Sequence, residues 1–168
     1  MITKLEVLPE NQLKDIVSIW LDTNKKAHSF IANSYWEDNI EFVEKELSKA
    51  DIYIATDENG KIIGFLGILE SYIAGLFVSS DYQRQGIGNK LIKRAKADFE
   101  ELSLTVYEKN KQAINFYTKE GFKISGTQID EDTKEIELVM VYKNWQWINQ
   151  LSVLCLLFFL FHIHQNSC

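Results

Sequence analysis

Six consecutive residues in the middle of the chain combine the residue types that bind phosphate groups. They are Gln83, Arg84, Gln85, Gly86, Ile87 and Gly88. A short apolar run at residues 76–78 precedes them, and from Ile87 onward apolar residues recur with the 3.6-residue period of a helix. The first N–H groups of a helix have no partner within it and lie at the positive end of its dipole. Glycines, an arginine and free amides at a helix start therefore predict a site for phosphate or pyrophosphate.

Two common nucleotide-binding loops do not fit this segment. A P-loop requires Gly-Lys followed by Ser or Thr, whereas this chain has Gly88-Asn89-Lys90. The dinucleotide fingerprint requires a small residue where Leu91 stands, although Glu108 lies at the distance that this motif expects for its acid. An ordinary strand-to-helix turn with an exposed arginine is one alternative. A nucleotide-binding α/β protein of another kind is a second.

The rest of the chain alternates short apolar runs with amphipathic segments, which predicts strands and helices around this loop. About seven strands are expected, at residues 2–7, 52–55, 62–69, 72–78, 102–107, 122–127 and 136–142. Four helices are expected: one after Pro9, one opened by the capping box Ser34-x-x-Glu37, one from Ile87, and one at residues 111–119 that Asn110 caps. The uneven order implies a mixed sheet, antiparallel at first, with one parallel step across the central helix. Such a step opens a crevice at the carboxyl ends of the two strands.

Two segments resemble motifs of the GCN5-related N-acetyltransferases, the GNAT family. Gln83-x-x-Gly86-x-Gly88 resembles the loop that binds the pyrophosphate of acetyl-CoA in that family. Residues 110–122 read Asn-Lys-Gln-Ala-Ile-Asn-Phe-Tyr-Thr-Lys-Glu-Gly-Phe, which is similar to the GNAT pattern Asn-x-x-Ala-x-x-Phe-Tyr-x-x-x-Gly-Phe. The resemblance covers residues 2–142. It implies an α/β fold with a GNAT-like mixed sheet of about seven strands flanked by four helices, and acetyl-CoA as co-substrate.

Acetyl transfer from a thioester to an amine sets four chemical tasks. The enzyme must hold the pyrophosphate, polarise the carbonyl, remove a proton from the amine and protonate the departing thiolate. The amides of residues 85–88 and the Arg84 side chain suit the first task. The strand edge at Leu76, Phe77 and Val78 is expected to bind the pantetheine arm through its main chain and to polarise the carbonyl.

The remaining two tasks depend more heavily on the resemblance. By it, Asn110 contacts the cofactor arm and Tyr117 protonates the thiolate, whereas periodicity alone favours Tyr117 as a core residue. Glu70, beside the turn into the cofactor strand, is the best-placed general base, with a surface hairpin glutamate as the alternative. Tyr107 and Glu108 end a neighbouring strand and offer a relay through water. Approximation of the two substrates can also supply most of the rate without a dedicated base.

Residues of the first two helices are candidates for binding the acceptor. A His-x-Phe-Ile stretch from His28 and the Tyr35-Trp36 pair resemble segments of the bacterial single-domain GNAT branch that includes protein lysine acetyltransferases. The resemblance implies that His28, Tyr35 and Trp36, together with Tyr107, line the amine site. A structural histidine and an aromatic anchor for the second helix are the alternatives.

Composition restricts the partners. The chain has 168 residues and a net charge of −6, with few clustered basic residues, which argues against nucleic acid. Its three histidines are scattered and both cysteines lie near the end, so neither a metal site nor a disulfide framework is expected. The first residues lack the apolar core of a signal peptide, so we expect a cytoplasmic protein whose acidic charge favours a cationic acceptor.

The domain predicted at residues 1–143 is followed by an unusual apolar tail at residues 144–168. No charged residue occurs between Trp145 and Ile163, and the uninterrupted apolar part is shorter than the roughly twenty residues of a membrane-spanning helix. Three interpretations remain open for this tail: a weak membrane anchor, an extra helix that packs on the domain or on a second copy in a homodimer, and a remnant without a selected role.

Two classes of function follow from these features. The first is an acetyl-CoA-dependent N-acetyltransferase that acts on a protein lysine, a protein N-terminus or a small amine by direct attack in a ternary complex. The second is a non-catalytic module that binds or senses acyl-CoA. Tyr117 discriminates between them, because a sensor needs no acid for a leaving thiolate.

Overall fold

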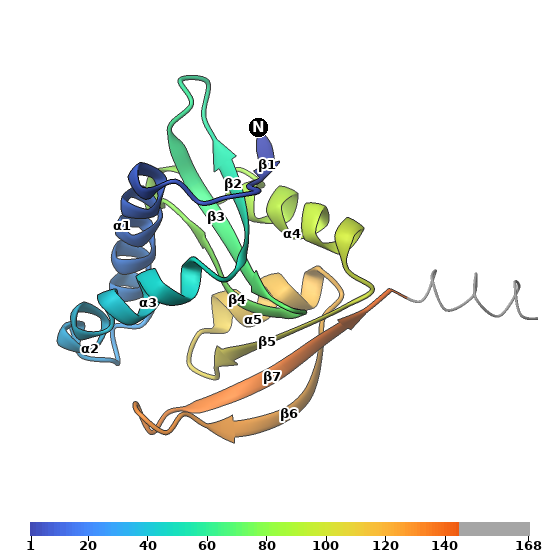
Figure 1. The fold of residues 1–168 in the computed structure, drawn as a ribbon. Coiled ribbons are helices and arrows are strands. Elements are labelled where there is room, and N and C mark those ends of the chain that lie inside the picture. Colours follow the sequence, from blue (N-terminus) through green and yellow to red (C-terminus); the bar gives the residue numbers. More distant parts are fainter. Residues whose placement is uncertain (145–168) are drawn as a thin grey trace, which may run out of the picture.

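The computed structural model describes residues 1–144, and residues 145–168 of the predicted tail lie outside this part. Seven strands form one sheet in the order β1-β2-β3-β4-β5-β7-β6. They are β1 (Ile2–Lys4), β2 (Asp51–Thr56), β3 (Ile62–Leu69), β4 (Tyr72–Val78), β5 (Glu101–Tyr107), β6 (Lys123–Ile129) and β7 (Ile136–Lys143). The helices are α1 (Glu10–Ala27), α2 (Asn33–Asp38), α3 (Ile40–Leu47), α4 (Ile87–Asp98) and α5 (Lys111–Lys119). Figure 1 shows α1, α2 and α3 on one face of the sheet and α4 and α5 on the other, which confirms the predicted α/β fold.

The alternation of side chains along β2 explains how both faces acquire a core. Ile52 and Ile54 pack with the core residues of α1, α2 and α3, whereas Tyr53 and Ala55 pack with those of α4 and α5. All four residues are at most 5% exposed. Successive strand residues point to opposite faces, so a strand covered on both sides is apolar at every position. This is why the central strands appear in the sequence as unbroken apolar runs.

The part of the chain that the structure describes contains five α-helices, one more than predicted. The segment expected as a single second helix is divided at Asn39 into α2 and α3. The Asn39 side-chain amide donates to the carbonyl of Tyr35 at 2.8 Å and so satisfies one of the last carbonyl groups of α2. A short polar side chain that bonds to nearby backbone in this way favours the end of a helix.

The predicted capping box is wrong. Helix α2 begins one residue before Ser34, with Ala32 at the N-cap position and no side-chain cap. Glu37, which the capping box would have turned back onto the backbone, forms an ion pair with Lys25 of α1 instead. The ion pair with α1 therefore replaces the local hydrogen bond that the capping box would have formed.

Strands β4 and β5 form the parallel step and separate toward their carboxyl ends. They share one ladder position, Tyr72 opposite Ser103. Strand β3 pairs with Ile73 and Gly75 of β4 and leaves Ala74 between them without a partner, which is a β-bulge. A bulge bends its strand and increases the local twist. The bend turns β4 away from β5, and the gap between the two strands becomes the site.

Among residues 1–144, no helix combines the length and the apolar character that crossing a bilayer requires.

Candidate active site

A cleft of about 300 Å³ lies between the diverging ends of β4 and β5. Helices α1, α2 and α5, the loop after β4 and a residue of β7 complete its walls. Residues that line it include Asn24, His28, Trp36, Leu76, Phe77, Val78, Gln83, Thr105, Tyr107, Asn110, Tyr117 and Glu137. The fold thus brings together most of the residues predicted to bind either acetyl-CoA or the amine.

The loop before α4 has the geometry of an anion site. Arg84 and Gly86 both have positive φ angles, 60° and 78°, and Gly86 is the N-cap of α4. The side chain of Gln83 donates to the Val78 carbonyl at 2.9 Å, and that of Gln85 donates to the Asp81 carbonyl at 3.1 Å. These two bonds fix the path of the loop. None of the backbone N–H groups of residues 85–88 donates to an acceptor among the described residues, so they are available for a phosphate.

The two glycines of this loop serve different purposes. A side chain at Gly86 would meet no atom within 4 Å, so the positive φ angle is what requires glycine there. At Gly88, an added Cβ would lie 3.4 Å from the side chains of Leu76 and Phe116. Glycine at position 88 therefore lets the first turn of α4 approach both β4 and α5, which places the helix N-terminus at the mouth of the cleft.

The edge of β4 that faces the cleft suits main-chain recognition of an extended ligand. Its other edge pairs with β3 along the strand, whereas beyond Tyr72 this edge has no strand partner in the described part of the chain. Backbone groups at residues 76–78 can therefore bind a chain that lies along them. Gly75 supports this arrangement, because a Cβ there would collide with the ring of Phe77, which lies against Phe65 with ring centroids 5.1 Å apart.

Asn110 joins two helices through the two halves of its side-chain amide. Its Oδ1 accepts a hydrogen bond from the backbone N–H of Ala113 at 3.0 Å, which is the predicted N-cap of α5. Its Nδ2 lies 3.1 Å from Nε2 of His28, at the end of α1. An amide nitrogen can only donate, so Nε2 of His28 accepts and the proton of the neutral ring lies on Nδ1.

His28 is held as a neutral ring by its surroundings. Burial lowers its pKa, and the neighbouring backbone carbonyl of Asn24 opposes this effect only in part. The ring stacks on Trp36 with centroids 5.4 Å apart and meets the edges of Phe30 and Tyr107 at 5.7 Å and 5.2 Å. His28 therefore forms part of an aromatic wall at one end of the cleft, with a nitrogen that bonds to Asn110.

Tyr117 lines the cleft with a hydroxyl that keeps its proton. It is 8% exposed and packs edge-to-face with Phe116 and Phe122. Its hydroxyl has no hydrogen-bond partner among residues 1–144 and is not sealed from solvent, so it is open to the cleft that Tyr117 lines. Burial, with a smaller contribution from Tyr72, raises the pKa of Tyr117, and the phenol therefore keeps its proton at neutral pH.

An acidic group lies at the end of the cleft that the aromatic wall borders. Glu137 is the one carboxylate among the described residues that line the cleft, and it stands opposite Tyr107 in the β5–β7 ladder. One of its oxygens accepts from the side chain of Gln128 at 2.8 Å. The hydroxyl of Tyr107 donates to Asp130 at 3.1 Å, in the loop between β6 and β7. Burial raises the pKa of Tyr107, which keeps it a neutral donor.

Apart from residues 84–88 of the loop before α4, three predicted residues do not line the cleft. Glu70 is an exposed residue of the β3–β4 turn with a φ angle of 57°, at the end where β4 and β5 still pair. It is therefore separated from the opening at the carboxyl ends. Tyr35 packs edge-to-face with Trp36, with ring centroids 5.1 Å apart, and Glu108 is exposed beyond the end of β5. Burial raises the pKa of Tyr35, and the carboxylates of Asp130, Asp132 and Glu137 add to the effect.

The structure also adds residues that sequence reasoning missed. Glu137 lies on a strand whose place beside β5 no local pattern reveals. Thr105, whose hydroxyl is 2.8 Å from that of Tyr72, lies on the floor of the cleft. Asn24 carried a signal that could have been used, because it continues the apolar stripe of its helix four residues after Trp20.

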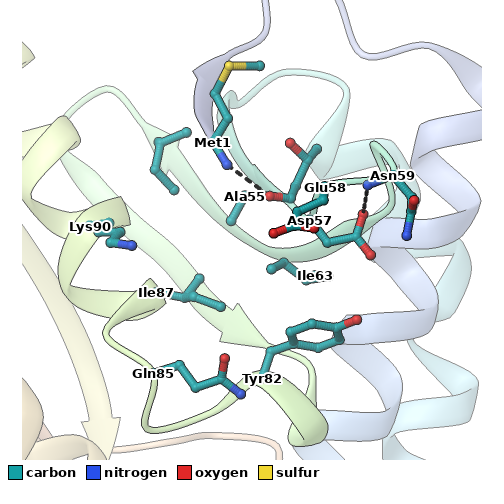
Figure 2. A pocket seen from close by; sticks show the side chains of 12 residues that line it. Met1, Ala55, Asp57, Glu58, Asn59, Ile63, Tyr82, Gln85, Ile87 and Lys90 are labelled. Atoms are coloured by element: carbon teal, nitrogen blue, oxygen red, sulfur yellow. Dashed lines mark hydrogen bonds between the residues drawn. The ribbon is translucent and has the colours of Figure 1, made fainter.

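A second cavity of about 470 Å³ lies behind the anion loop. Figure 2 shows Ile87 and Lys90 of α4 and Gln85 and Tyr82 of the loop facing the β2–β3 turn at residues 57–59. The Gln85 and Ile87 side chains therefore point away from the cleft. Gln85 and Ile87 can therefore contact acetyl-CoA only through their backbone N–H groups.

The anion loop, the gap between two parallel strands and the tyrosine of α5 are features of an acetyltransferase. A family model described as an acetyltransferase (GNAT) domain matches residues 48–124. The chain belongs to the GNAT family, and it is an acyltransferase that acts on an amine.

Individual relatives define the branch more closely. The chain is 34% identical over 131 residues to the peptidyl-lysine N-acetyltransferase YiaC of Escherichia coli strain K12, a match that covers 74% of this chain and 86% of the relative. The apo form of YjaB from Escherichia coli superimposes with a TM-score of 0.73 at 26% identity, covering 84% of this chain and 96% of that one. An aminoglycoside 6′-N-acetyltransferase complexed with coenzyme A shares the fold, with a TM-score of 0.63 at 13% identity over 85% of this chain and 96% of the other.

Proposed function

We propose that this chain transfers the acetyl group of acetyl-CoA to the ε-amine of lysine side chains in proteins, and that residues 1–143 form the catalytic domain. The observation that carries the proposal is the cleft between β4 and β5, which has a free strand edge on one side and the Tyr117 hydroxyl on the other. The similarity to peptidyl-lysine N-acetyltransferases supports the choice of acceptor.

Each part of acetyl-CoA has a matching surface. The pyrophosphate would accept hydrogen bonds from the free amides of residues 85–88, with Arg84 as the counter-charge. The pantetheine arm would lie along residues 76–78 of β4, beside Asn110. A backbone N–H at this edge would then donate to the acetyl oxygen as negative charge develops on it.

The opposite end of the cleft suits a cationic amine. Glu137 lies within it, and Asp130 and Asp132 are close enough to raise the pKa of nearby Tyr35. This negative field would attract a lysine ammonium group, and the faces of Trp36 and Tyr107 would pack against its methylene chain. The three carboxylates would repel an acidic acceptor.

The bound lysine ammonium first loses one proton to water, because only the neutral amine carries a lone pair. The reaction then needs one bond made, one bond broken and two further proton transfers: the amine nitrogen attacks the acetyl carbon, the carbon–sulfur bond breaks, and the thiolate takes the proton of the Tyr117 hydroxyl. The proton that the attacking nitrogen loses would pass to Glu137, directly or through water. Tyr117 then recovers its proton from solvent in the open cleft.

A panel of acceptors tests the proposal. The purified chain is mixed with acetyl-CoA and with two peptides of otherwise equal sequence, one with a blocked N-terminus and a single lysine, the other with a free N-terminus and arginine in place of lysine. We expect thiol release, and a mass increase of one acetyl group, with the lysine peptide. Turnover on small amines alone would show that the acceptor is a small amine and not a protein lysine. Binding of coenzyme A without turnover on any amine would favour a non-catalytic module that senses acyl-CoA.

A further inference from the structure

Two polar residues interrupt the buried stripe of α1 next to the cleft. Thr23 and Asn24 are 7% and 4% exposed and follow Ile16, Val17 and Trp20 on the face that packs against the sheet. The Thr23 hydroxyl is satisfied, because it donates to the carbonyl of residue 19 at 2.6 Å. Buried polar groups are stable only when they are paired, so the pairing of Asn24 decides what it does.

Only half of the Asn24 amide is paired within the protein. Its Nδ2 donates to the carbonyl of Trp20 at 2.9 Å. A carbonyl oxygen cannot donate, so the nitrogen must face Trp20 and Oδ1 must point away from it. No described residue donates a hydrogen bond to Oδ1.

The free oxygen is open to the cleft. Within residues 1–144, three polar side-chain atoms lack both a partner and contact with solvent: Gln12 Oε1, His28 Nδ1 and Trp36 Nε1. Asn24 Oδ1 is not among them, so the small exposed part of this residue includes its oxygen. Asn24 lines the cleft, so we infer that its oxygen contacts the water that fills the cleft. A bound substrate would displace this water.

We propose that Asn24 is a substrate-binding residue whose Oδ1 accepts a hydrogen bond from an N–H group of one of the two reactants, an assignment that rests on the proposed function. Both reactants carry such a donor: an amide of the pantetheine arm and the attacking amine itself. The oxygen is held in place by a helix and by the Trp20 carbonyl, so binding it costs little side-chain entropy.

The test compares two asparagines that have the same structural bond. Asn39 also donates its Nδ2 to the carbonyl four residues earlier, at 2.8 Å, but it does not line the cleft. Asn24→Leu and Asn39→Leu both remove this bond and are both expected to lower the melting temperature. Only Asn24→Leu should raise a KM, by about tenfold, which is the usual loss for one hydrogen bond to a buried partner.

The substrate whose KM rises identifies the donor. A higher KM for acetyl-CoA, with weaker binding of coenzyme A in calorimetry, assigns the pantetheine amide, whereas a higher KM for the lysine peptide assigns the amine. Asn24→Asp loses the bond to Trp20 but keeps an accepting oxygen, so the same KM should rise less in Asn24→Asp than in Asn24→Leu despite its lower stability. If Asn24→Leu fails to fold, Asn24→Ala removes the same oxygen with less bulk.

Unchanged KM values in Asn24→Leu, or equal increases in Asn39→Leu, would overturn the assignment. A wild-type chain that acetylates no amine would instead refute the proposed function, so the two failures are distinguishable.

Discussion

Replacing Tyr117 by Phe isolates the proton that the mechanism requires. The hydroxyl has no hydrogen-bond partner among residues 1–144, and the contacts of the ring with Phe116 and Phe122 persist in the variant. Removing the hydroxyl therefore breaks no protein hydrogen bond and opens no cavity, so the free energy of unfolding should change by less than about 0.5 kcal/mol. An acid in the transition state contributes about 10²–10⁴ in rate, which is roughly 3–5 kcal/mol of barrier.

We therefore expect Tyr117→Phe to lower kcat at least a hundredfold while the Kd for coenzyme A changes by less than about threefold. Thiol release measures the first quantity and calorimetry the second. Since burial raises the pKa of Tyr117, the wild type should also lose no rate to its deprotonation up to about pH 9. Tyr142→Phe is the matched control, because Tyr142 packs on Phe122 but does not line the cleft. An unchanged kcat in Tyr117→Phe, or an equal loss in Tyr142→Phe, would refute the assignment.

Three further substitutions probe the rest of the site. Glu137→Gln should lower kcat/KM for a lysine peptide about tenfold or more and leave coenzyme A binding unchanged, because it removes the carboxylate that lines the cleft. Steady-state kinetics measure this effect, with Glu135→Gln as the control because Glu135 does not line the cleft. Gly86→Ala should cost about 1–2 kcal/mol in a denaturant titration and weaken coenzyme A binding, because only the positive φ angle, and no steric contact, opposes a side chain there. The pKa of His28 is lowered in the folded state, so below the ordinary value of 6.5 the unfolded chain binds more protons and folding loses stability. The melting temperature should thus fall between pH 7.5 and about 5.5 by more in the wild type than in His28→Gln, and parallel curves would show that His28 contributes nothing.

Much of the fold could be predicted because its signals are local. The bounds of α5 at residues 111–119 and its Asn110 cap depend on periodicity and on one side chain. Strands β3 and β4 lie where the apolar runs indicated. The anion loop was predicted because glycines, an arginine and a helix start are contiguous in the chain.

Other features depend on contacts that the sequence does not display. Asn39 divides a predicted helix, and Glu37 leaves its capping box for an ion pair with α1. The general base was predicted at Glu70, which is next to β4 in sequence but lies at the end where β4 and β5 pair, opposite to the opening. Glu137 reaches the cleft only because β7 inserts between β5 and β6, an order that no local pattern specifies.

The sequence by itself determined the α/β class, the glycine-containing loop before α4 and the tyrosine helix α5, because each depends on neighbours within a few residues. The tertiary structure decided which side chains share the cleft. It gave β4 a bulge at Ala74, bonded Asn110 to His28, and placed Asn24, whose Oδ1 accepts no hydrogen bond from a described residue, in the lining of the cleft. The physical reason is that a hydrogen bond or a carboxylate acts over a few ångströms, and only the pairing of distant strands brings these groups within that range.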